Sequence, residues 1–403
     1  MVGSASNWVE EHKNEAIQLL QEFIRIPSPS GHEKMCGEKV AEAMRVAGFD
    51  SFKVDTLGDA MGVLKGSGGG RSLLMNGHID HVPPGDMIDP YSGKLMDGSV
   101  FGIPTQVVYG RAACDMKAAV AAMIMAGAYF KGTDIQLRGD YKVVAVAQEE
   151  IGGAGTMSTI ENDHFLADVV LVGEATGMGF ALGHRGSIKM SVVVRGRSCH
   201  ASAPERGINA LYKATDLIIR IRDELASRLP TDPLYGKTSL AVTVIEVKPG
   251  VFNVVPDECR FYLDCRNSPN YPAEDLYRDL QNLIKDQSEN DPDFKAVVLP
   301  TPLIRGQRSF TGFYTNPETY YVVDEVKTAI CGALGKVPKN KTWTFATDGR
   351  FYSWLGLPVI GFGPGEECFA HTSMDHVRVD EYLKTIEVYA AIAEKVCGVS
   401  KAP

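Results

Sequence analysis

The chain lacks an excess of basic side chains. It has 41 lysines and arginines against 50 aspartates and glutamates among 403 residues, which gives a net charge of −9. Proteins that bind nucleic acid or anionic membrane surfaces carry basic patches or a basic excess. We therefore expect neither nucleic acid nor a membrane as a partner, while a small charged substrate stays open.

Long hydrophobic runs are also missing. The longest uncharged apolar run is Ala118–Phe130, and its thirteen residues are too few for a bilayer, which takes roughly 20. The N-terminus has no basic region followed by an apolar core, as a secretory signal would. We therefore expect a cytoplasmic protein, with Ala118–Phe130 as a buried helix.

Two common site motifs are absent as well. The eight cysteines are scattered without a Cys-x-x-Cys pair, so neither a zinc ribbon nor a thioredoxin-type redox site is indicated. In the cytoplasm they would be reduced thiols. The glycine-rich stretch 66–70 lacks the Gly-Lys-Ser/Thr ending of a phosphate-binding loop, which argues against nucleotide binding.

The arrangement of apolar residues changes twice along the chain. Residues 1–184 and 297–403 contain short apolar runs that end in polar residues, a pattern typical of a mixed, largely parallel sheet covered by helices. The predicted strands of this α/β part are 71–80, 141–150, 168–174 and 357–363, and its predicted helices are 10–25, 116–130, 322–334 and 379–397.

Residues 185–296 have a different pattern. Their order is strand, helix, strand, strand, helix, over the segments 187–195, 209–229, 239–247, 259–265 and 274–287. This order is typical of a small α+β sandwich. The sequence therefore predicts an α/β domain with a second, inserted α+β domain.

Histidine and acidic residues follow the predicted strands directly. In open α/β sheets, ligand sites form at these carboxyl ends. His78 and Asp80 lie two residues apart, on one side of an extended segment, so His78 can bind a metal while Asp80 holds its other ring nitrogen. Asp115 comes just before the helix 116–130, where it is either an N-cap or a bridging metal ligand.

Further acids and a second histidine extend this pattern. Glu149 and Glu150 are adjacent at a strand end, where burying both without cations is costly, so one can bind metal while the other acts as a base. Glu174 follows the next strand, and His371 stands near the C-terminus. Two histidines and three carboxylates match a two-metal site with one bridging carboxylate. Zn²⁺ suits such ligands best, and Mn²⁺ or Co²⁺ also fits.

In this ordered set the chain resembles the co-catalytic two-zinc amidohydrolases and exopeptidases. That family includes acetylornithine deacetylase, succinyl-diaminopimelate desuccinylase, aminoacylase and glutamate carboxypeptidase. The resemblance extends from Pro27–Ser30 to the C-terminal helix, and the stretches 198–207, 341–345 and 360–365 are most similar to a subgroup linked to selenium metabolism. It implies a zinc-exopeptidase-like catalytic domain whose inserted sandwich is a lid and forms a homodimer.

The resemblance also implies roles for the acidic and histidine residues. One metal would be held by His78, Asp115 and Glu174, and the other by Asp115, Glu150 and His371. Asp80 would be the partner of His78, and Glu149 would be the general base. A cis peptide bond would follow Asp115.

Two departures from the family pattern stand beside these residues. Relatives usually carry glycine where this chain has Ala112, and again where it has Ala118 and Ala119. The histidine signature ends in Asp375 and His376, where relatives often have Pro-Asn-Glu. His371 is the better ligand candidate of the two histidines.

Four further residues are candidates for contact with substrate. The resemblance implies that His200 reaches into a partner subunit and stabilises the oxyanion, and that Asn253 binds substrate. Arg266 is a candidate clamp for a carboxylate, with a salt bridge at the strand end as the alternative. Arg350 is a second, weaker candidate clamp. Asp348 either pairs with Arg350 or caps the helix that follows.

The predicted activity is metal-dependent hydrolysis of an amide. The substrate would be an N-acyl or N-carbamoyl amino acid, or a short peptide, with a free carboxylate. Within the same family, a dipeptidase or carboxypeptidase is the alternative. An alternative of another class is a non-catalytic binder of small molecules on this fold.

Overall fold

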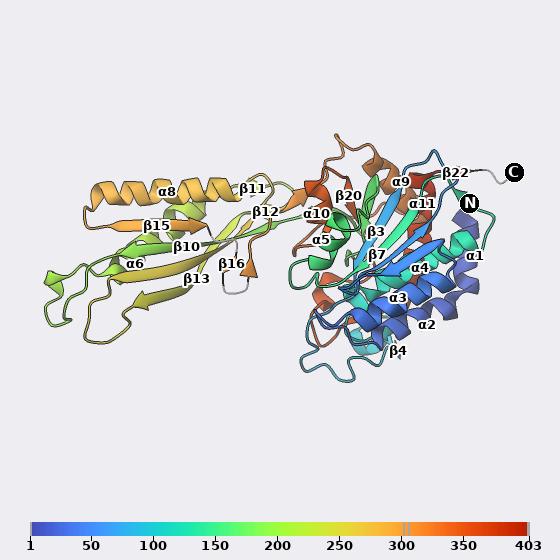
Figure 1. The fold of residues 1–403 in the computed structure, drawn as a ribbon, viewed down its shortest axis with the longest axis horizontal. Coiled ribbons are helices and arrows are strands. Elements are labelled where there is room, and N and C mark those ends of the chain that lie inside the picture. The colour runs from blue at the N-terminus through green and yellow to red at the C-terminus, as the bar shows by residue number, and fades with distance from the viewer. Residues whose placement is uncertain (1, 301–302, 305–306, 401–403) are drawn as a thin grey trace. The chain divides into compact units, whose positions relative to one another are not determined.

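The computed structural model describes residues 2–300, 303–304 and 307–400, and the chain forms two compact units (Figure 1). The larger unit contains residues 1–183, 315–343 and 347–403, and the smaller contains 184–314 and 344–346. The sequence predicts crossings near residues 184 and 297, whereas the second crossing lies at 314/315. The chain stays in the smaller unit past residue 297 because Lys295–Pro300 (β15) pairs with Gly186–Arg195 (β10) and Phe310 forms a backbone bridge with Ser187.

A mixed sheet forms the centre of the larger unit. Within the larger unit its strand order is β1-β2-β7-β3-β8-β20-β9, β19 also pairs with β9, and the order continues past β9 to the short strand β18 (Phe313–Tyr314). β7, β3, β8 and β20 pair in parallel, and the pairs β1–β2, β2–β7 and β20–β9 are antiparallel. The strand bounds are β1 Ser51–Val54, β2 Ala60–Leu64, β3 Leu73–His78, β7 Tyr141–Val146, β8 Val169–Val172, β9 Phe180–His184, β19 Asn340–Trp343 and β20 Val359–Gly361.

Helices cover both faces of this sheet, as the α/β prediction requires (Figure 1). A Cβ atom on Gly77 of β3 would lie 2.9 Å from Val120 in α4. The side chain of Asn76, the next residue back, donates to the Tyr352 hydroxyl in α10 at 3.3 Å. Because neighbouring side chains of a strand point to opposite faces, His78 lies on the α10 side.

The helices of the larger unit follow the predicted ranges with local breaks. Their bounds are α1 Val2–Glu11, α2 Lys13–Ile24, α3 Lys34–Val46, α4 Ala118–Lys131, α5 Ala154–Glu161, α9 Val322–Leu334, α10 Gly349–Trp354 and α11 Val379–Cys397. The predicted helix 10–25 is interrupted at His12. The predicted helix 116–130 starts at Ala118, because Asp115 and Met116 have non-helical backbone angles.

A small sheet that the sequence did not predict joins two distant segments. β4 (Lys94–Asp97), β5 (Gln106–Tyr109) and β21 (His376–Arg378) form three antiparallel strands in the order β21-β5-β4. β5 runs toward Asp115, and β21 follows His371 in the chain. Their pairing therefore brings the C-terminal histidine signature beside the acidic turn.

The smaller unit is an α+β sandwich. Its antiparallel sheet has the order β13-β14-β10-β15, with β13 at Ser239–Lys248 and β14 at Glu258–Asn267. α6 (Ala210–Arg220) and α8 (Ala273–Asn290) bury apolar side chains against this sheet in a core of its own. The predicted helix 209–229 is divided, because residues 221–225 form a wider π-type turn before α7 (Ala226–Arg228).

Short elements complete the described chain. They are η1 Gly98–Phe101, η2 Ala113–Lys117, β6 Gln136–Leu137, η3 Pro204–Arg206, η4 Ile221–Leu225, β11 Thr231–Asp232, β12 Gly236–Lys237, β16 Leu303–Ile304, β17 Gln307–Arg308, β18 Phe313–Tyr314, η5 Glu367–Phe369 and β22 Val399–Ser400. The eight cysteines are all free thiols.

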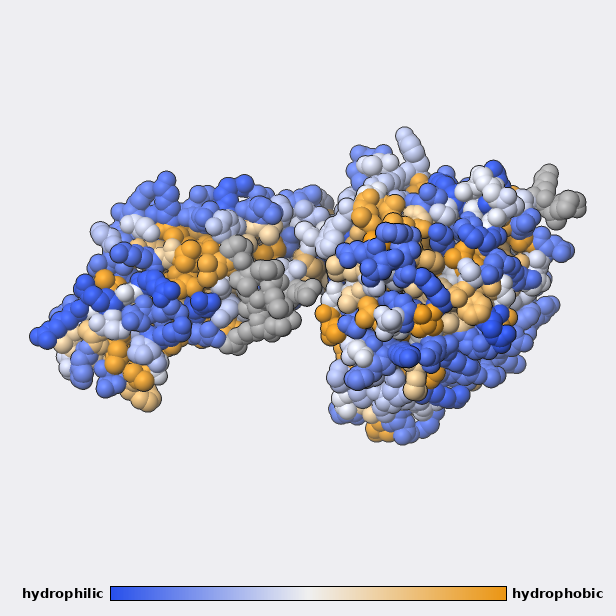
Figure 2. All heavy atoms as spheres, viewed as in Figure 1, coloured by the Kyte–Doolittle hydropathy of each residue, from blue (hydrophilic) through white to orange (hydrophobic). Residues whose placement is uncertain are grey.

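The apolar run around residue 120 lies inside the larger unit. Within the described residues, Ala113–Lys131 is the one helical stretch long and apolar enough to cross a membrane, and 94% of its most apolar window is buried in the protein. It packs against β3, β7 and α11. The surface seen in Figure 2 is largely hydrophilic on both units, with separate apolar patches.

Asp59, just before β2, is a buried acid whose protonation links the stability of the larger unit to pH. Its Oδ1 accepts the Ala147 amide at 2.6 Å, and its Oδ2 has no hydrogen-bond partner among the described residues. Burial, together with the nearby Asp55 and Asp348 carboxylates, raises the pKa of Asp59 to about 8. The folded protein therefore holds a proton that the unfolded chain releases above about pH 4, and the stability that Asp59 contributes falls as the pH rises toward 8.

We expect Asp59→Asn to remove this pH dependence. Between pH 6 and pH 8, the wild-type protein should lose more stability than the variant, by at most about 1.4 kcal/mol per pH unit. Melting temperatures of both proteins across this range measure the difference, with the exposed Asp86→Asn as control. Parallel curves for wild type and Asp59→Asn would contradict the prediction.

Candidate metal centre

The predicted ligands of the larger unit meet at one edge of its sheet. His78 ends β3, Glu149 and Glu150 follow β7, and Glu174 follows β8. These three strands are adjacent and parallel, so their carboxyl ends share that edge. The structure thus brings together residues that are up to about a hundred positions apart in the chain.

Asp115 lies between two imidazoles. Its Oδ1 is 2.9 Å from Nε2 of His78, and its Oδ2 is 3.1 Å from Nε2 of His371. Glu150 approaches the same His371 nitrogen at 2.9 Å, and Glu174 lies 3.7 Å from Nε2 of His78. Each oxygen of Asp115 thus faces a different histidine, which is the arrangement of a carboxylate shared by two cations.

The donor set fits divalent metal ions. Two overlapping groups, His78 with Glu149 and Glu174, and His78 with Asp115 and Glu150, each offer ligand atoms within 4.8 Å of one another. Glu174 Oε2 is buried and has no hydrogen-bond partner among the described residues. An unpartnered buried carboxylate oxygen is costly, and a cation in this cluster would satisfy it.

The electrostatics of the cluster point the same way. Burial raises the pKa of Glu174 and of Glu149 well above the usual range. Hydrogen bonds to Asp115 and Glu150 raise the pKa of His371 to about 10. Burial opposes ionisation of Asp115, but hydrogen bonds from His371 and His78 outweigh it and lower its pKa. The acids thus depend on positive charge to stay ionised, and bound metal ions would supply it.

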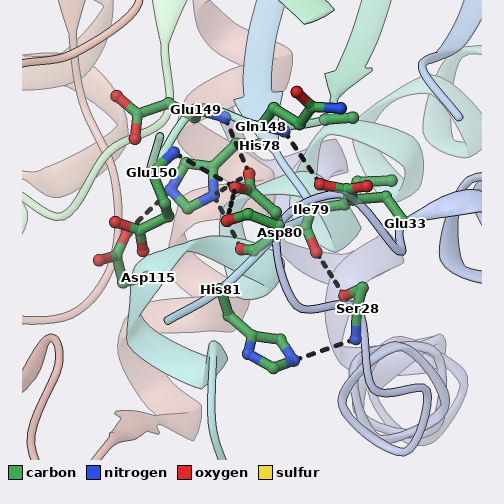
Figure 3. A network of polar contacts seen from close by, with 12 residues as sticks. Ser28, Glu33, His78, Ile79, Asp80, His81, Asp115, Gln148, Glu149 and Glu150 are labelled. Carbon is green, nitrogen blue, oxygen red and sulfur yellow. Dashed lines mark hydrogen bonds and ion pairs between the residues drawn. The ribbon is translucent and has the colours of Figure 1, made fainter. Parts of the chain in front are cut away.

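Asp80 holds both His78 and the glutamate turn, as Figure 3 shows. His78 Nδ1 lies 3.0 Å from the Asp80 backbone oxygen and 3.4 Å from its carboxylate. The carboxylate also accepts the Ser30 hydroxyl at 2.7 Å and the amides of Glu149 and Glu150 at 3.1 and 3.2 Å. A proton on Nδ1 leaves the lone pair of Nε2 free for a metal.

A buried acid to which the sequence assigned no role holds the turn before Asp115. Asp375 accepts the amides of Cys114 and Ala112 at 2.9 and 2.8 Å, and it pairs with Arg111 at 3.1 Å. Ala112 has a φ of 67°, in the left-handed region, where alanine is strained and glycine is not. A glycine at this position, as the resemblance leads us to expect, would adopt this conformation without strain. The peptide bond after Asp115 is cis, as expected.

His376, the second histidine of the C-terminal signature, lies outside the cluster. Its ring is buried and stacks on Phe101 at 4.3 Å and against Phe369 at 4.4 Å, measured between ring centroids. Burial lowers its pKa. It is a packing residue of β21.

Arg350 is buried and already engaged. Its guanidinium donates to the carbonyls of Thr347 and Gly152 at 3.0 and 3.2 Å, and lies 3.5 Å from Asp348. Asp348 in turn accepts the Thr156 hydroxyl at 2.6 Å. These contacts favour the alternative weighed above, a pair with Asp348, over a clamp for a substrate carboxylate.

The other candidate substrate residues lie in the smaller unit. His200 is exposed, and its Nδ1 accepts the backbone amide of Ser202 at 3.1 Å. Asn253 is exposed on a neighbouring segment, where its carbonyl accepts the Ala201 amide at 3.0 Å.

Arg266 is the third of these residues. Its guanidinium Nε donates to Asp264 of its own strand at 2.9 Å. Its side chain is 47% exposed, so the pair with Asp264 leaves part of the guanidinium open to other groups. His200, Asn253 and Arg266 all belong to the smaller unit.

Comparison with known proteins agrees with this architecture. Residues 74–395 match the profile of peptidase family M20/M25/M40. The uncharacterized protein YgeY of Escherichia coli is 29% identical over 400 residues, covering 95% of this chain and 94% of that protein. Acetylornithine deacetylase of Myxococcus xanthus is 28% identical over 369 residues, covering 88% and 90%.

Solved structures share the fold at low sequence identity. Aminopeptidase PepT of Bacillus cereus superposes with a TM-score of 0.75 at 20% identity, covering 95% of this chain and 98% of that one. The YXEP protein of Bacillus subtilis, a dinuclear metal-binding peptidase from family M20, has a TM-score of 0.73 at 12% identity, covering 97% and 100%. Since the family profile spans well over half of the chain, the protein belongs to peptidase family M20/M25/M40 and is a metal-dependent hydrolase of amide bonds.

Proposed function

We propose that the protein hydrolyses the amide bond of an N-acyl or N-carbamoyl amino acid, or of a short peptide, that carries a free carboxylate. The observation that carries this proposal is the Asp115 carboxylate between His78 and His371, with Glu149 beside them. Relatives named as a deacetylase and a desuccinylase support the substrate class. Structural neighbours named as peptidases support the peptide alternative.

Two divalent metal ions, most simply Zn²⁺ with Mn²⁺ or Co²⁺ as alternatives, would occupy the cluster. His78, Asp115 and Glu174 would hold one, and Asp115, Glu150 and His371 the other. The short distances of Asp115 to both imidazoles support this assignment. When bound, such ions supply a water of lowered pKa and stabilise developing negative charge.

Glu149 is the proposed general base. Its amide is fixed by Asp80 at 3.1 Å, and burial, followed by the charge of Asp348, raises its pKa. A raised pKa makes a carboxylate a stronger base toward the proton of the attacking water. The Glu149 carboxylate would take a proton from the attacking water and return it to the leaving nitrogen of the amide.

His200, Asn253 and Arg266 are proposed to contact the substrate from the inserted unit. The Ser202 amide donates to His200 Nδ1, so a neutral ring carries its proton on Nε2 and can donate to a developing oxyanion. We propose that His200 does this in a homodimer, across the interface. The cytoplasmic location likewise stays a prediction.

A non-catalytic binder on this fold is the alternative of another class. A site that has lost its chemistry is expected to lack at least one of its ligands. Here all five predicted metal ligands are present, and four of them, His78, Asp115, Glu150 and His371, lie within 3.1 Å of another member of the set. The geometry therefore favours an enzyme.

Removal and return of metal test the proposed activity. Amine release from a panel of N-acetyl, N-succinyl and N-carbamoyl amino acids and dipeptides should be lost in chelator and return with Zn²⁺, Mn²⁺ or Co²⁺. The substrates that respond distinguish a deacylase from a dipeptidase. No hydrolysis by protein with two bound metal ions per chain would contradict the proposed substrate class.

Glu149→Gln tests the role of the base. The amide keeps the shape of the side chain but cannot accept the proton, so kcat should fall by about 10²- to 10⁴-fold. Two metal ions should stay bound, as measured by elemental analysis. The exposed Glu161→Gln, in α5, is the matched control. Loss of a metal ion in Glu149→Gln would move Glu149 into the ligand set instead.

A further inference from the structure

Three consecutive amides of the glutamate turn are bound by two buried carboxylates (Figure 3). Asp80 accepts the amides of Glu149 and Glu150. The amide of Gln148, just before them, donates to Oε1 of Glu33 at 3.1 Å. Glu33 lies outside the motifs around residues 78, 115 and 371, and none of them predicts its contact with this turn.

Glu33 is built into the protein as a fixed acceptor. It is 1% exposed and lies at the start of α3. The same Oε1 also accepts the amide of Gly31 at 2.7 Å. A buried carboxylate is costly unless hydrogen bonds satisfy it, and these two amides do so. The Glu33 carboxylate thereby links the segment before α3 to the turn after β7.

The turn needs support at this position. Gln148 has a φ of 59°, which side-chain-bearing residues rarely adopt. Inside the turn, the amide of Gly152 donates to the Glu149 carbonyl at 3.0 Å, and the amide of Gly153 donates to the Gln148 carbonyl at 2.7 Å. Glu33 thus binds the amide of the strained residue Gln148, and Glu149 follows Gln148 directly.

We propose that Glu33 is a positioning residue for hydrolysis, acting through the backbone of Gln148 to fix Glu149. This inference rests on the proposed role of Glu149 as base. Without this acceptor, the Gln148 peptide loses its hydrogen bond, so the strained backbone just before Glu149 is held less firmly. The Glu149 amide stays on Asp80, but its carboxylate is placed less precisely against the reacting water. The metal ligands keep their own contacts, because Asp115 is held by Asp375 through its turn and the Glu150 amide by Asp80.

Two variants of Glu33 distinguish the effect of side-chain length from the effect of its negative charge. Glu33→Asp keeps the charge but shortens the side chain by one methylene, so it no longer reaches the Gln148 amide. Aspartate is also a favoured N-cap residue, so the start of α3 stays intact. Glu33→Gln keeps the reach and the acceptor oxygen but loses the charge. Glu38→Asp, at an exposed position of the same helix, is the matched control.

The kinetic test uses the full-length, zinc-loaded protein and the panel substrate that it cleaves best. In Glu33→Asp, kcat should fall by about 10- to 100-fold, since small misplacements of a catalytic group cost this much. KM should stay within about twofold, and both metal ions should remain bound. Glu33→Gln and Glu38→Asp should keep wild-type kcat. An unchanged kcat in Glu33→Asp, or loss of metal in step with kcat, would overturn the proposal.

Hydrogen exchange gives a readout that needs no substrate. Amides of residues 147–153 should exchange faster in Glu33→Asp than in wild type, and at the wild-type rate in Glu33→Gln. If wild-type protein cleaves nothing in the panel, the proposed function fails, and this exchange experiment still decides the inference. Equal exchange in Glu33→Asp and wild type would then overturn it.

Discussion

The rest of the site depends on the placement of Asp115 between two histidines. A carboxylate this deeply buried is unfavourable unless opposite charge or strong donors surround it. His78 contacts it from the end of the central strand β3, and His371 contacts it from the C-terminal part of the chain, just before β21. The position of His78 depends on the central parallel strands, and the position of His371 depends on the pairing of β5 with β21. The site therefore forms only when both parts of the larger unit are folded.

Backbone amides provide the second means of holding the acids. Glu33, Asp80 and Asp375 each accept at least two backbone amides and are nearly inaccessible to solvent. Hydrogen bonds from N–H groups to a carboxylate are stronger than neutral ones. These three acids thus shape the turns around Asp115 and Glu149 and leave the cluster itself free to hold cations.

Three of the six described non-glycine residues with positive φ lie in turns of the site. Ala112, Gln148 and His371 all have positive φ values, each at a cost of roughly 1–3 kcal/mol. Each residue lies in a turn that presents a candidate ligand or base. Such conformations persist only where the surrounding contacts over-determine them, and the buried acids provide these contacts for Ala112 and Gln148.

The fold class, a second compact unit and the local position of each candidate ligand could be predicted from the amino-acid sequence, because strand and helix periodicity and the acids at strand ends are local features. The sequence could not reveal β4, β5 and β21, the position of the second crossing at 314/315, or the roles of Glu33 and Asp375, and it left the role of Arg350 open between two alternatives. Those depend on which distant segments pair and on what a buried side chain then meets. An isolated glutamate at a helix start belongs to no sequence motif, and its contact with the turn that carries Glu149 arises only when α3 packs beside the end of β7.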